Sequence, residues 1–189
     1  VGKASFVNAA VGQKVAIVSD KPQTTRTRIM GVLNVKENQL VFVDTPGFHK
    51  PRNMLDQYMS KATQNGLSDV EAAVLVVEAA PKFKFDYENL PPAELELIEQ
   101  FKKRKLPVVL AVNKIDLLEK KDELLTMISA YMSCFEFAAV VPISAKNKDG
   151  IEIIVSELIK FSKPGPHYFD EDTVTDQPDR TMVAEIIRE

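Results

Sequence analysis

The sequence has little of what disulfide frameworks, metal centres and membrane spans require. Cys134 is the only cysteine among the 189 residues, so an internal disulfide is excluded and a reducing compartment is expected. The two histidines, His49 and His167, are far apart in the sequence and have no cysteine nearby, which argues against a zinc site. No apolar run reaches the ~18 residues of a membrane span, and no signal peptide is recognised.

The chain also lacks a strong excess of either charge. It has 24 Lys and Arg against 27 Asp and Glu, a net charge of -3, and so does not resemble a strongly basic nucleic-acid-binding surface. Its 45% hydrophobic and 27% charged residues are typical of a soluble globular protein. The length allows one domain with a buried core and a fragment of a second.

The later half of the chain alternates short valine-rich runs with amphipathic helical patterns. Buried parallel strands joined by crossover helices produce this alternation, so we expect a doubly wound α/β sheet. The predicted strands are residues 29–35, 40–44, 71–80, 106–114 and 137–145, with a brief extended segment at VAIVS. The predicted helices are residues 5–12, 54–67, 91–105, 120–132 and 150–161.

The motif NKID, Asn113-Lys114-Ile115-Asp116, directly follows one predicted strand. Guanine presents two neighbouring donors, N1–H and the exocyclic amine, and a single carboxylate such as Asp116 can accept both. Adenine lacks this pair, so the contact selects guanine at about 1.5–3 kcal/mol for a charge-assisted bond. The Lys114 stem can lie over the base, and Asn113 can tie the loop down. A polar turn after a strand is the alternative interpretation.

Three weaker motifs occupy comparable places. DTPG, residues 44–47, follows a strand, so Asp44 can hold magnesium through a water and the Gly47 N–H can approach a γ-phosphate. SAK, residues 144–146, follows the last strand, and the Ala145 N–H can donate to guanine O6. TTR, residues 24–26, lies in a polar loop, where the Thr25 hydroxyl can complete the magnesium coordination. Each motif alone is also compatible with an ordinary turn.

The chain opens VGKASF, in which Gly2-Lys3 matches the end of the phosphate-loop pattern G-x-x-x-x-G-K-[ST]. With QTTR, DTPG, NKID and SAK following in order, the sequence resembles the translation-factor-related GTPases, and within them the Era family of bacterial ribosome-assembly GTPases. The resemblance covers nearly the whole chain, including TDQPDRTMVAEIIRE at its end.

The resemblance implies a P-loop GTPase fold with a mostly parallel sheet and helices on both faces. Residues 1–163 are expected to form the guanine-nucleotide domain, 164–178 a linker, and 179–189 the first helix of a truncated KH-like domain. The implied cofactors are GTP or GDP with Mg²⁺. Catalytic roles are expected for Lys3, Thr25 and Gly47, and metal ligation for Thr25 and Asp44. The residues expected at the nucleotide are Gly2, Lys3, Ala4, Ser5, Asp44, Thr45, Pro46, Gly47, Phe48, Asn113, Lys114, Ile115, Asp116, Ser144, Ala145 and Lys146.

The implied partners beyond the nucleotide are small-subunit ribosomal RNA and the ribosomal subunit, for the full-length family member. Its KH domain binds the 3′ end of that RNA, and the GXXG loop of such a domain is not in this sequence. The expected location is cytoplasmic, with peripheral attachment to the inner face of the membrane left open.

Three features depart from the common GTPase pattern. Phe48 stands where Ras-like proteins have a glutamine that orients the attacking water. The Era group also has an apolar residue at this position, so another group or a monovalent cation such as K⁺ must help hydrolysis. Ala4 stands where the family has a magnesium-ligating serine. Ser5 matches the position that contacts the α-phosphate, and its location makes it a poor substitute for the missing ligand. The strand that should precede the phosphate loop is absent, so we expect the natural protein to continue before Val1.

These departures leave alternatives to an active Era-like switch. One is a GTP- or GDP-binding interaction module whose hydrolysis is impaired by Ala4. Another is a GTPase of the same superfamily that acts on tRNA.

Overall fold

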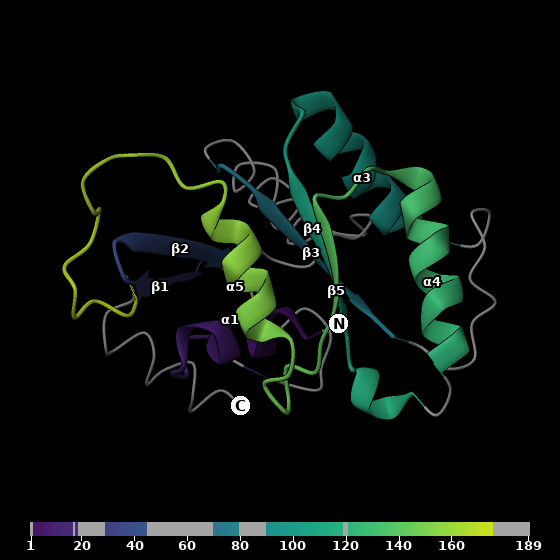
Figure 1. Ribbon diagram of the computed structural model, residues 1–189, viewed down its shortest axis with the longest axis horizontal. Helices are drawn as coiled ribbons and strands as arrows, with labels where there is room; N and C mark the ends of the chain where they lie inside the picture. Colours follow the sequence, from purple (N-terminus) through teal and green to yellow (C-terminus); the bar gives the residue numbers. More distant parts are fainter. Residues whose placement is uncertain are drawn as a thin grey trace, which may run out of the picture. The chain divides into compact units, whose positions relative to one another are not determined.

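The computed structural model describes residues 2–16, 18, 29–44, 70–79, 90–118 and 121–175, drawn in colour in Figure 1. They form two compact units. The first comprises residues 70–157, and the second comprises residues 2–69 and 158–189 as far as these ranges are described. No helix within the described ranges has the length and apolar character needed to cross a membrane.

The first unit contains a parallel three-stranded sheet in the order β3-β4-β5. Its strands are β3 (Ala73–Glu78), β4 (Val108–Asn113) and β5 (Ala139–Pro142). Helix α3 (Pro92–Arg104) connects β3 to β4, α4 (Lys121–Cys134) connects β4 to β5, and α5 (Ile151–Ile159) follows β5. Figure 1 shows α3 and α4 on one side of this sheet and α5 on the other, as in a doubly wound fold.

Strand β4 lies at the centre of this sheet, and its side chains from Val108 to Val112 are fully buried. A strand covered by helices on both faces has no solvated side, which explains the uninterrupted apolar run VVLAV. Ile98 and Phe101 of α3 and Met127 and Tyr131 of α4 are buried in the same core.

Helix α3 begins and ends within one residue of the predicted range, whereas α4 ends two residues later than predicted and α5 two residues earlier. Pro92 opens α3, and the basic residues Lys102, Lys103 and Arg104 occupy its last turn, where they complement the negative end of the helix. The Tyr131 hydroxyl donates a hydrogen bond to the Glu94 carboxylate and so links α4 to α3. Burial raises the pKa of Glu94, while the bond from Tyr131 acts in the opposite direction.

The second unit is built on an antiparallel hairpin of β1 (Ile29–Val35) and β2 (Asn38–Asp44), paired from Ile29 opposite Asp44 to Val35 opposite Asn38. Helix α1 (Lys3–Val11) packs against it. The Phe6 ring meets the Phe42 ring edge-on at 5.9 Å. Gly31 is buried under α1, where an added Cβ would lie 3.0 Å from Val11 Cγ2 and 3.1 Å from Val7 Cγ1.

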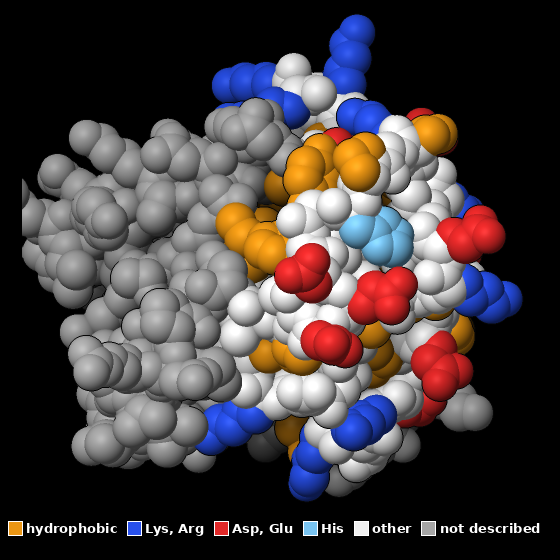
Figure 2. All heavy atoms as spheres, turned by 90° about the vertical axis from the view of Figure 1, so that its left-hand side faces the viewer, with side chains coloured by type: hydrophobic (Ala, Val, Ile, Leu, Met, Phe, Trp, Pro, Cys, Tyr) orange, Lys and Arg blue, Asp and Glu red, His pale blue; other side chains and the backbone are white. Residues whose placement is uncertain are grey.

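Residues 167–175 of the expected linker are hydrogen-bonded along this hairpin, and we call this segment the strap. The Gln39 amide accepts from the Tyr168 and Phe169 N–H groups at 2.9 and 3.0 Å and donates to the Phe169 carbonyl at 2.9 Å. Thr175 Oγ1 donates to the Met30 carbonyl at 2.7 Å. Figure 2 shows acidic side chains gathered around a histidine on this face; the exposed acidic residues of the strap and hairpin are Glu37, Asp170, Glu171 and Asp172.

The predicted α/β class and the order of the described elements are confirmed. Strand β2 begins at Asn38 rather than residue 40, because the connection after Val35 is only two residues, with Lys36 at φ 54°. The described part of VAIVS forms no strand. The helix expected at 54–67 and the second-domain helix at 179–189 lie outside the described residues. Cys134 is buried, as predicted, with Sγ 3.2 Å from the Ala130 carbonyl.

The Asn8 side chain holds the loop after α1 and provides a test of the second unit. Its Oδ1 accepts from the Val15 and Ala16 N–H groups, both at 2.8 Å, and its Nδ2 donates to the Ala16 carbonyl at 2.7 Å. Asn8→Ala should lower the free energy of unfolding by about 1–3 kcal/mol, because it leaves buried backbone groups without partners. It should also speed hydrogen exchange at Val15 and Ala16.

The matched control is Asn8→Asp, which keeps the acceptor for both amides and loses only the donor. It should preserve most of their protection. Unchanged exchange at Val15 and Ala16 in Asn8→Ala would show that this side chain does not hold the loop.

Candidate functional site

The loops after β3, β4 and β5 lie at one edge of the parallel sheet. The register sets Glu78 opposite Asn113 and Val112 opposite Pro142, so the residues that follow these strands emerge together. This is the edge at which ligands bind in doubly wound folds.

Asn113, the last residue of β4, joins the second of these loops to the third. It is 2% exposed, and its Oδ1 accepts a hydrogen bond from the Ala145 N–H at 3.0 Å. Its carbonyl accepts from the Ala79 N–H at 2.8 Å, after β3. Asn113 therefore links the loop after β4 to the loop after β5 and to the end of β3. The Ala145 N–H, expected to donate to guanine O6, is engaged by Asn113 here.

The Asp116 carboxylate is positioned by a buried hydroxyl. Ser144 Oγ, in a residue only 1% exposed, donates to Asp116 Oδ1 at 2.6 Å and accepts from the Asn147 N–H at 3.3 Å. Asp116 itself is exposed, in the short helix η2 (Ile115–Leu117). One oxygen is thus fixed from inside the protein while the carboxylate faces solvent, an arrangement suited to accepting donors from a ligand.

Lys114 adopts the left-handed conformation, with φ 67°, and turns its side chain toward the neighbouring strand. Its Nζ lies 2.7 Å from Glu78 Oε1, and both side chains are partly exposed, at 38% and 39%. Burial by itself would raise the pKa of Glu78, but the Lys114 ammonium acts in the opposite direction and the pKa lies below its ordinary value. The adjacent Ile115 N–H donates to the Ile143 carbonyl at 3.2 Å.

A tight turn presents the SAK residues. The Ser144 and Asp149 backbones exchange two hydrogen bonds, of 3.1 and 3.0 Å, so residues 145–148 form a closed loop with Lys146 exposed. Gly150 follows at φ 73°. An added Cβ there would lie 2.6 Å from the Pro142 carbonyl oxygen, so only glycine fits.

The residues expected to bind phosphate lie in the second unit. Gly2, at φ 83°, precedes α1, and Lys3, Ala4 and Ser5 form its first turn. Among the described residues no side chain caps this helix, and its own first turn contains no acidic residue, so the positive end of the helix has no carboxylate from this turn. Ala4 contributes no oxygen, and Ser5 is half-buried.

The other expected site residues belong to ranges that are not described. Thr25, Thr45, Pro46, Gly47 and Phe48 lie outside the described residues, and Asp44 is described only as the backbone end of β2. Within the described part of the chain, no group of three or more His, Cys, Asp and Glu side chains could hold a metal ion. The structure thus brings together Asn113, Lys114, Asp116, Ser144 and Ala145.

The sequence reasoning missed three residues that shape this group. They are Glu78, Asp149 and Gly150. Glu78 could have been found from its place at the carboxyl end of the strand beside β4. Gly150 could have been found as a glycine between a polar turn and a helix. The pairing of Ser144 with Asp149 had no signal in the sequence.

Comparisons with known proteins bear on this arrangement. Residues 1–114 match the family model described as 50S ribosome-binding GTPase. The whole chain is 42% identical over 191 residues to GTPase Era of Ruminiclostridium cellulolyticum, and 41% identical over 189 residues to GTPase Era of Clostridioides difficile. The chain spans 61% of the length of each of these relatives.

Two solved structures are similar in fold and sequence. Era in complex with MgGDPNP and nucleotides 1506–1542 of 16S ribosomal RNA superposes with a TM-score of 0.89 at 32% identity, covering 100% of this chain and 62% of that chain. A point variant of Aquifex aeolicus Era bound to GDP.AlF4- gives a TM-score of 0.88 at 32% identity, covering 99% and 62%. The predicted resemblance to the Era family is confirmed.

Gly150 provides a test of the turn that carries Ser144 and Ala145. Gly12→Ala also places a side chain at positive φ, 80°, but in open space, so it should cost only the left-handed strain of about 1–2 kcal/mol. Gly150→Ala should lower the free energy of unfolding by a further 1–3 kcal/mol or so, because its Cβ meets the Pro142 carbonyl. Urea denaturation of both variants gives the comparison. Equal losses would show that the contact with Pro142 does not constrain the turn.

Proposed function

This chain belongs to the 50S ribosome-binding GTPase family, and we propose that it is the guanine-nucleotide-binding part of an Era-type GTPase that hydrolyses GTP. The observation that carries the proposal is the hydrogen bond from buried Ser144 to Asp116, next to the bond from Ala145 to Asn113. Together they hold a solvent-facing carboxylate at the ligand-binding edge of the sheet.

The carboxylate of Asp116 would accept N1–H and the exocyclic amine of guanine. Ser144 supports this role because its bond to Oδ1 restricts the carboxylate to one orientation before the base arrives, which reduces the ordering cost of binding. Lys114 contributes its aliphatic stem at the base while its ammonium stays paired with Glu78. Ala145 would share its N–H between Asn113 and guanine O6, since one donor can serve two acceptors.

The Gly2–Lys3 start of α1 would hold phosphate oxygens. Backbone N–H groups at a helix N-terminus and a lysine ammonium both attract phosphate without needing a hydroxyl. GDP binding therefore does not depend on the residue at position 4. The Thr25 and Gly47 contacts to a γ-phosphate stay predictions that rest on the family resemblance.

Magnesium, when bound with GTP, would neutralise the charge that develops as the γ-phosphoryl group departs. Of this chain's own residues, Thr25 and Asp44 are proposed to hold it. Ala4 does not fit this role, because a methyl group cannot coordinate a cation. Lys3 would offset charge on the phosphates. Phe48 cannot orient water, so we propose that a group outside the described residues, or a monovalent cation such as K⁺, does so.

Small-subunit ribosomal RNA is the proposed partner of the whole protein. An Era structure similar to this chain contains nucleotides of 16S ribosomal RNA. The exposed acidic residues on the strap and hairpin would repel phosphate, so the RNA contact is assigned to the part of the relatives' length that this chain does not span. The proposed location is the cytoplasm, and peripheral attachment to the inner face of the membrane is a second proposal.

The second candidate is a nucleotide-binding interaction module with impaired hydrolysis. The observation that favours it is Ala4 in the first turn of α1. A GTPase acting on tRNA stays a third alternative. Continuation of the natural protein into a small domain with a GXXG loop would decide against it.

Asp116 provides the test of base selectivity. Asp116→Asn replaces an acceptor by an amide that can donate, so guanine nucleotides should bind more weakly by about a hundredfold or more, since two charge-assisted bonds are lost. Xanthosine diphosphate, whose base has an oxygen at that edge, should bind to Asp116→Asn more tightly than it binds to the unsubstituted protein. Calorimetry of the full-length protein with GDP and with xanthosine diphosphate measures both changes in affinity.

The matched control is Asp122→Asn, an exposed aspartate in the first turn of α4. It should leave both affinities unchanged. Undiminished GDP affinity in Asp116→Asn would place the base pocket elsewhere.

Ala4 provides the test of hydrolysis. Ala4→Ser supplies a magnesium ligand, so the rate of GTP hydrolysis should rise at least about tenfold, which is about 1.4 kcal/mol in the barrier, and less magnesium should be needed. GDP affinity should change by less than about threefold. Phosphate release by the full-length protein at rising magnesium measures the hydrolysis rate and the magnesium requirement. Calorimetry measures the GDP affinity.

Ala9→Ser on the same helix is the control and should change neither rate nor magnesium dependence. If Ala4→Ser behaves like Ala9→Ser, residue 4 is not at the metal, and the alignment of Gly2-Lys3 with the phosphate-loop pattern is wrong.

A further inference from the structure

The end of β3 and the loop after β4 are joined by an ion pair as well as by backbone hydrogen bonds. Glu78 ends β3, and the strand register sets it opposite Asn113, the residue before Lys114. The Ala79 N–H donates to the Asn113 carbonyl at 2.8 Å, and Val77 and Ala79, on either side of Glu78, are buried. The backbone of Glu78 is therefore held at a fixed place beside the lysine, as a positioning group requires.

Lys114 has a backbone conformation that costs energy for a residue with a side chain. Its φ is 67°, in the left-handed region, where a glycine would be free of strain. Lys36, Lys105 and Lys148 also have positive φ, but all three are exposed, whereas Lys114 is half-buried and paired with Glu78. Strain at a residue whose side chain is held points to a use of that side chain, and not of the turn alone.

The ion pair fixes the far end of the Lys114 side chain. Its Nζ lies 2.7 Å from Glu78 Oε1, the distance of a charge-assisted hydrogen bond. Burial raises the pKa of Glu78 and the Lys114 ammonium lowers it, and the resulting pKa lies below its ordinary value, so the carboxylate is charged at neutral pH. A free lysine side chain samples many rotamers, whereas one held at both ends keeps its methylene groups in one place.

Asp116 offers a competing carboxylate two residues along the chain from Lys114. Ser144 Oγ donates to its Oδ1, and the residue is exposed. An ammonium paired with this carboxylate would compete with the guanine donors for the same acceptor. The pair with Glu78 thus directs the lysine charge away from the carboxylate that is proposed to read the base.

We propose that Glu78 is a positioning residue for base binding. It holds the Lys114 ammonium at the end of β3, which keeps the lysine stem at the base and the ammonium away from Asp116. This role rests on the proposed guanine site, and it gives Glu78 no contact with the nucleotide. If the Lys114 ammonium itself bound the nucleotide, its release from Glu78 would strengthen binding instead of weakening it.

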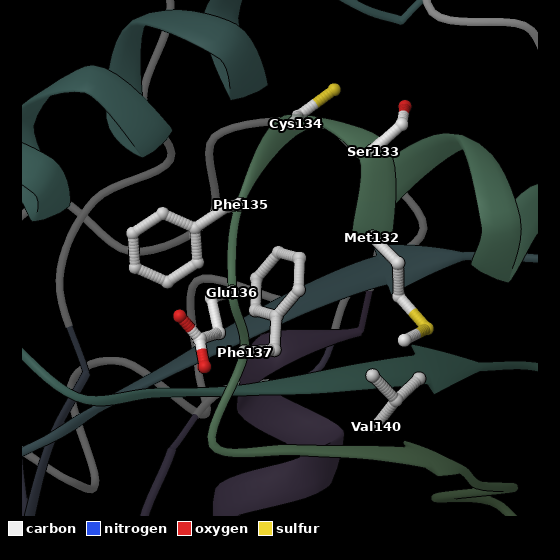
Figure 3. A pocket seen from close by; sticks show the side chains of 7 residues that line it. All are labelled: Met132, Ser133, Cys134, Phe135, Glu136, Phe137 and Val140. Atoms are coloured by element: carbon white, nitrogen blue, oxygen red, sulfur yellow. The ribbon is translucent and has the colours of Figure 1, made fainter.

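A second lysine–glutamate pair, at the opposite edge of the sheet, provides a matched comparison. Lys102 Nζ lies 2.7 Å from Glu99 Oε1 near the end of α3. Figure 3 shows the pocket at this edge, between the end of α4 and the start of β5, and Phe135 of that pocket lies 6.4 Å from Phe101 of α3. The Glu99 pair therefore has the same length as the Glu78 pair but lies away from the loops after β3, β4 and β5.

A double-mutant cycle on the full-length protein, with GDP affinity measured by calorimetry, tests this role. Glu78→Gln keeps the size of the side chain and removes its charge, and it should weaken GDP binding about three- to tenfold. Lys114→Met keeps an apolar stem and removes the ammonium, and it should weaken binding by a similar factor. The double variant should bind GDP no more weakly than either single variant, because each substitution removes the same pair. Glu99→Gln should leave the affinity unchanged.

Unchanged or tighter GDP binding in Glu78→Gln would overturn the proposal. Losses that add in the double variant would also overturn it, because Glu78 would then act independently of Lys114, as a merely structural residue does. Asp116→Asn distinguishes this proposal from the proposed function. If it weakens GDP binding and Glu78→Gln does not, only the role of Glu78 is wrong. If Asp116→Asn leaves GDP affinity unchanged, the base site lies elsewhere and the role of Glu78 is wrong with it.

Discussion

A buried amide at the end of a buried strand is the constraint on which the candidate site depends. Asn113 ends β4, whose preceding residues are fully buried, and at 2% exposure its side chain must find partners inside the protein. It finds one in the Ala145 N–H, and this bond joins the loop after β4 to the loop after β5. Ser144, adjacent to Ala145, is then in place to hold Asp116. One buried polar group thereby orients the exposed carboxylate proposed to read the base.

The same parallel sheet separates two kinds of surface. The carboxyl ends of its strands carry polar residues that are paired with one another, such as Lys114 with Glu78 and Ser144 with Asp116. The opposite edge, before β5, carries the Phe135 and Phe137 rings and the basic last turn of α3. Paired polar groups suit a site that must keep one geometry for a small ligand.

In the second unit, the strap adds a further constraint. Gln39 on β2 and Met30 on β1 both bond to it, so the hairpin is held by residues more than a hundred positions later in the sequence. The hairpin lies in sequence between the two segments that carry Thr25 and Gly47.

The sequence by itself determined the type and order of the described α-helices and of strands β1 to β5, and it determined the motifs NKID and SAK. Periodicity and strand-end position carry that information locally, because burial on both faces demands a continuous apolar run, as in VVLAV, and glycine and proline mark the turns. The resemblance to the Era family also followed from the sequence, through the order of the motifs and the segments around them. Only the tertiary structure decided that Glu78 pairs with Lys114, that Asp149 closes the turn begun by Ser144, and that the strap lies on the hairpin. These contacts join residues that are distant in sequence or that have no periodic pattern. They follow from strand register and packing, which a local pattern does not encode.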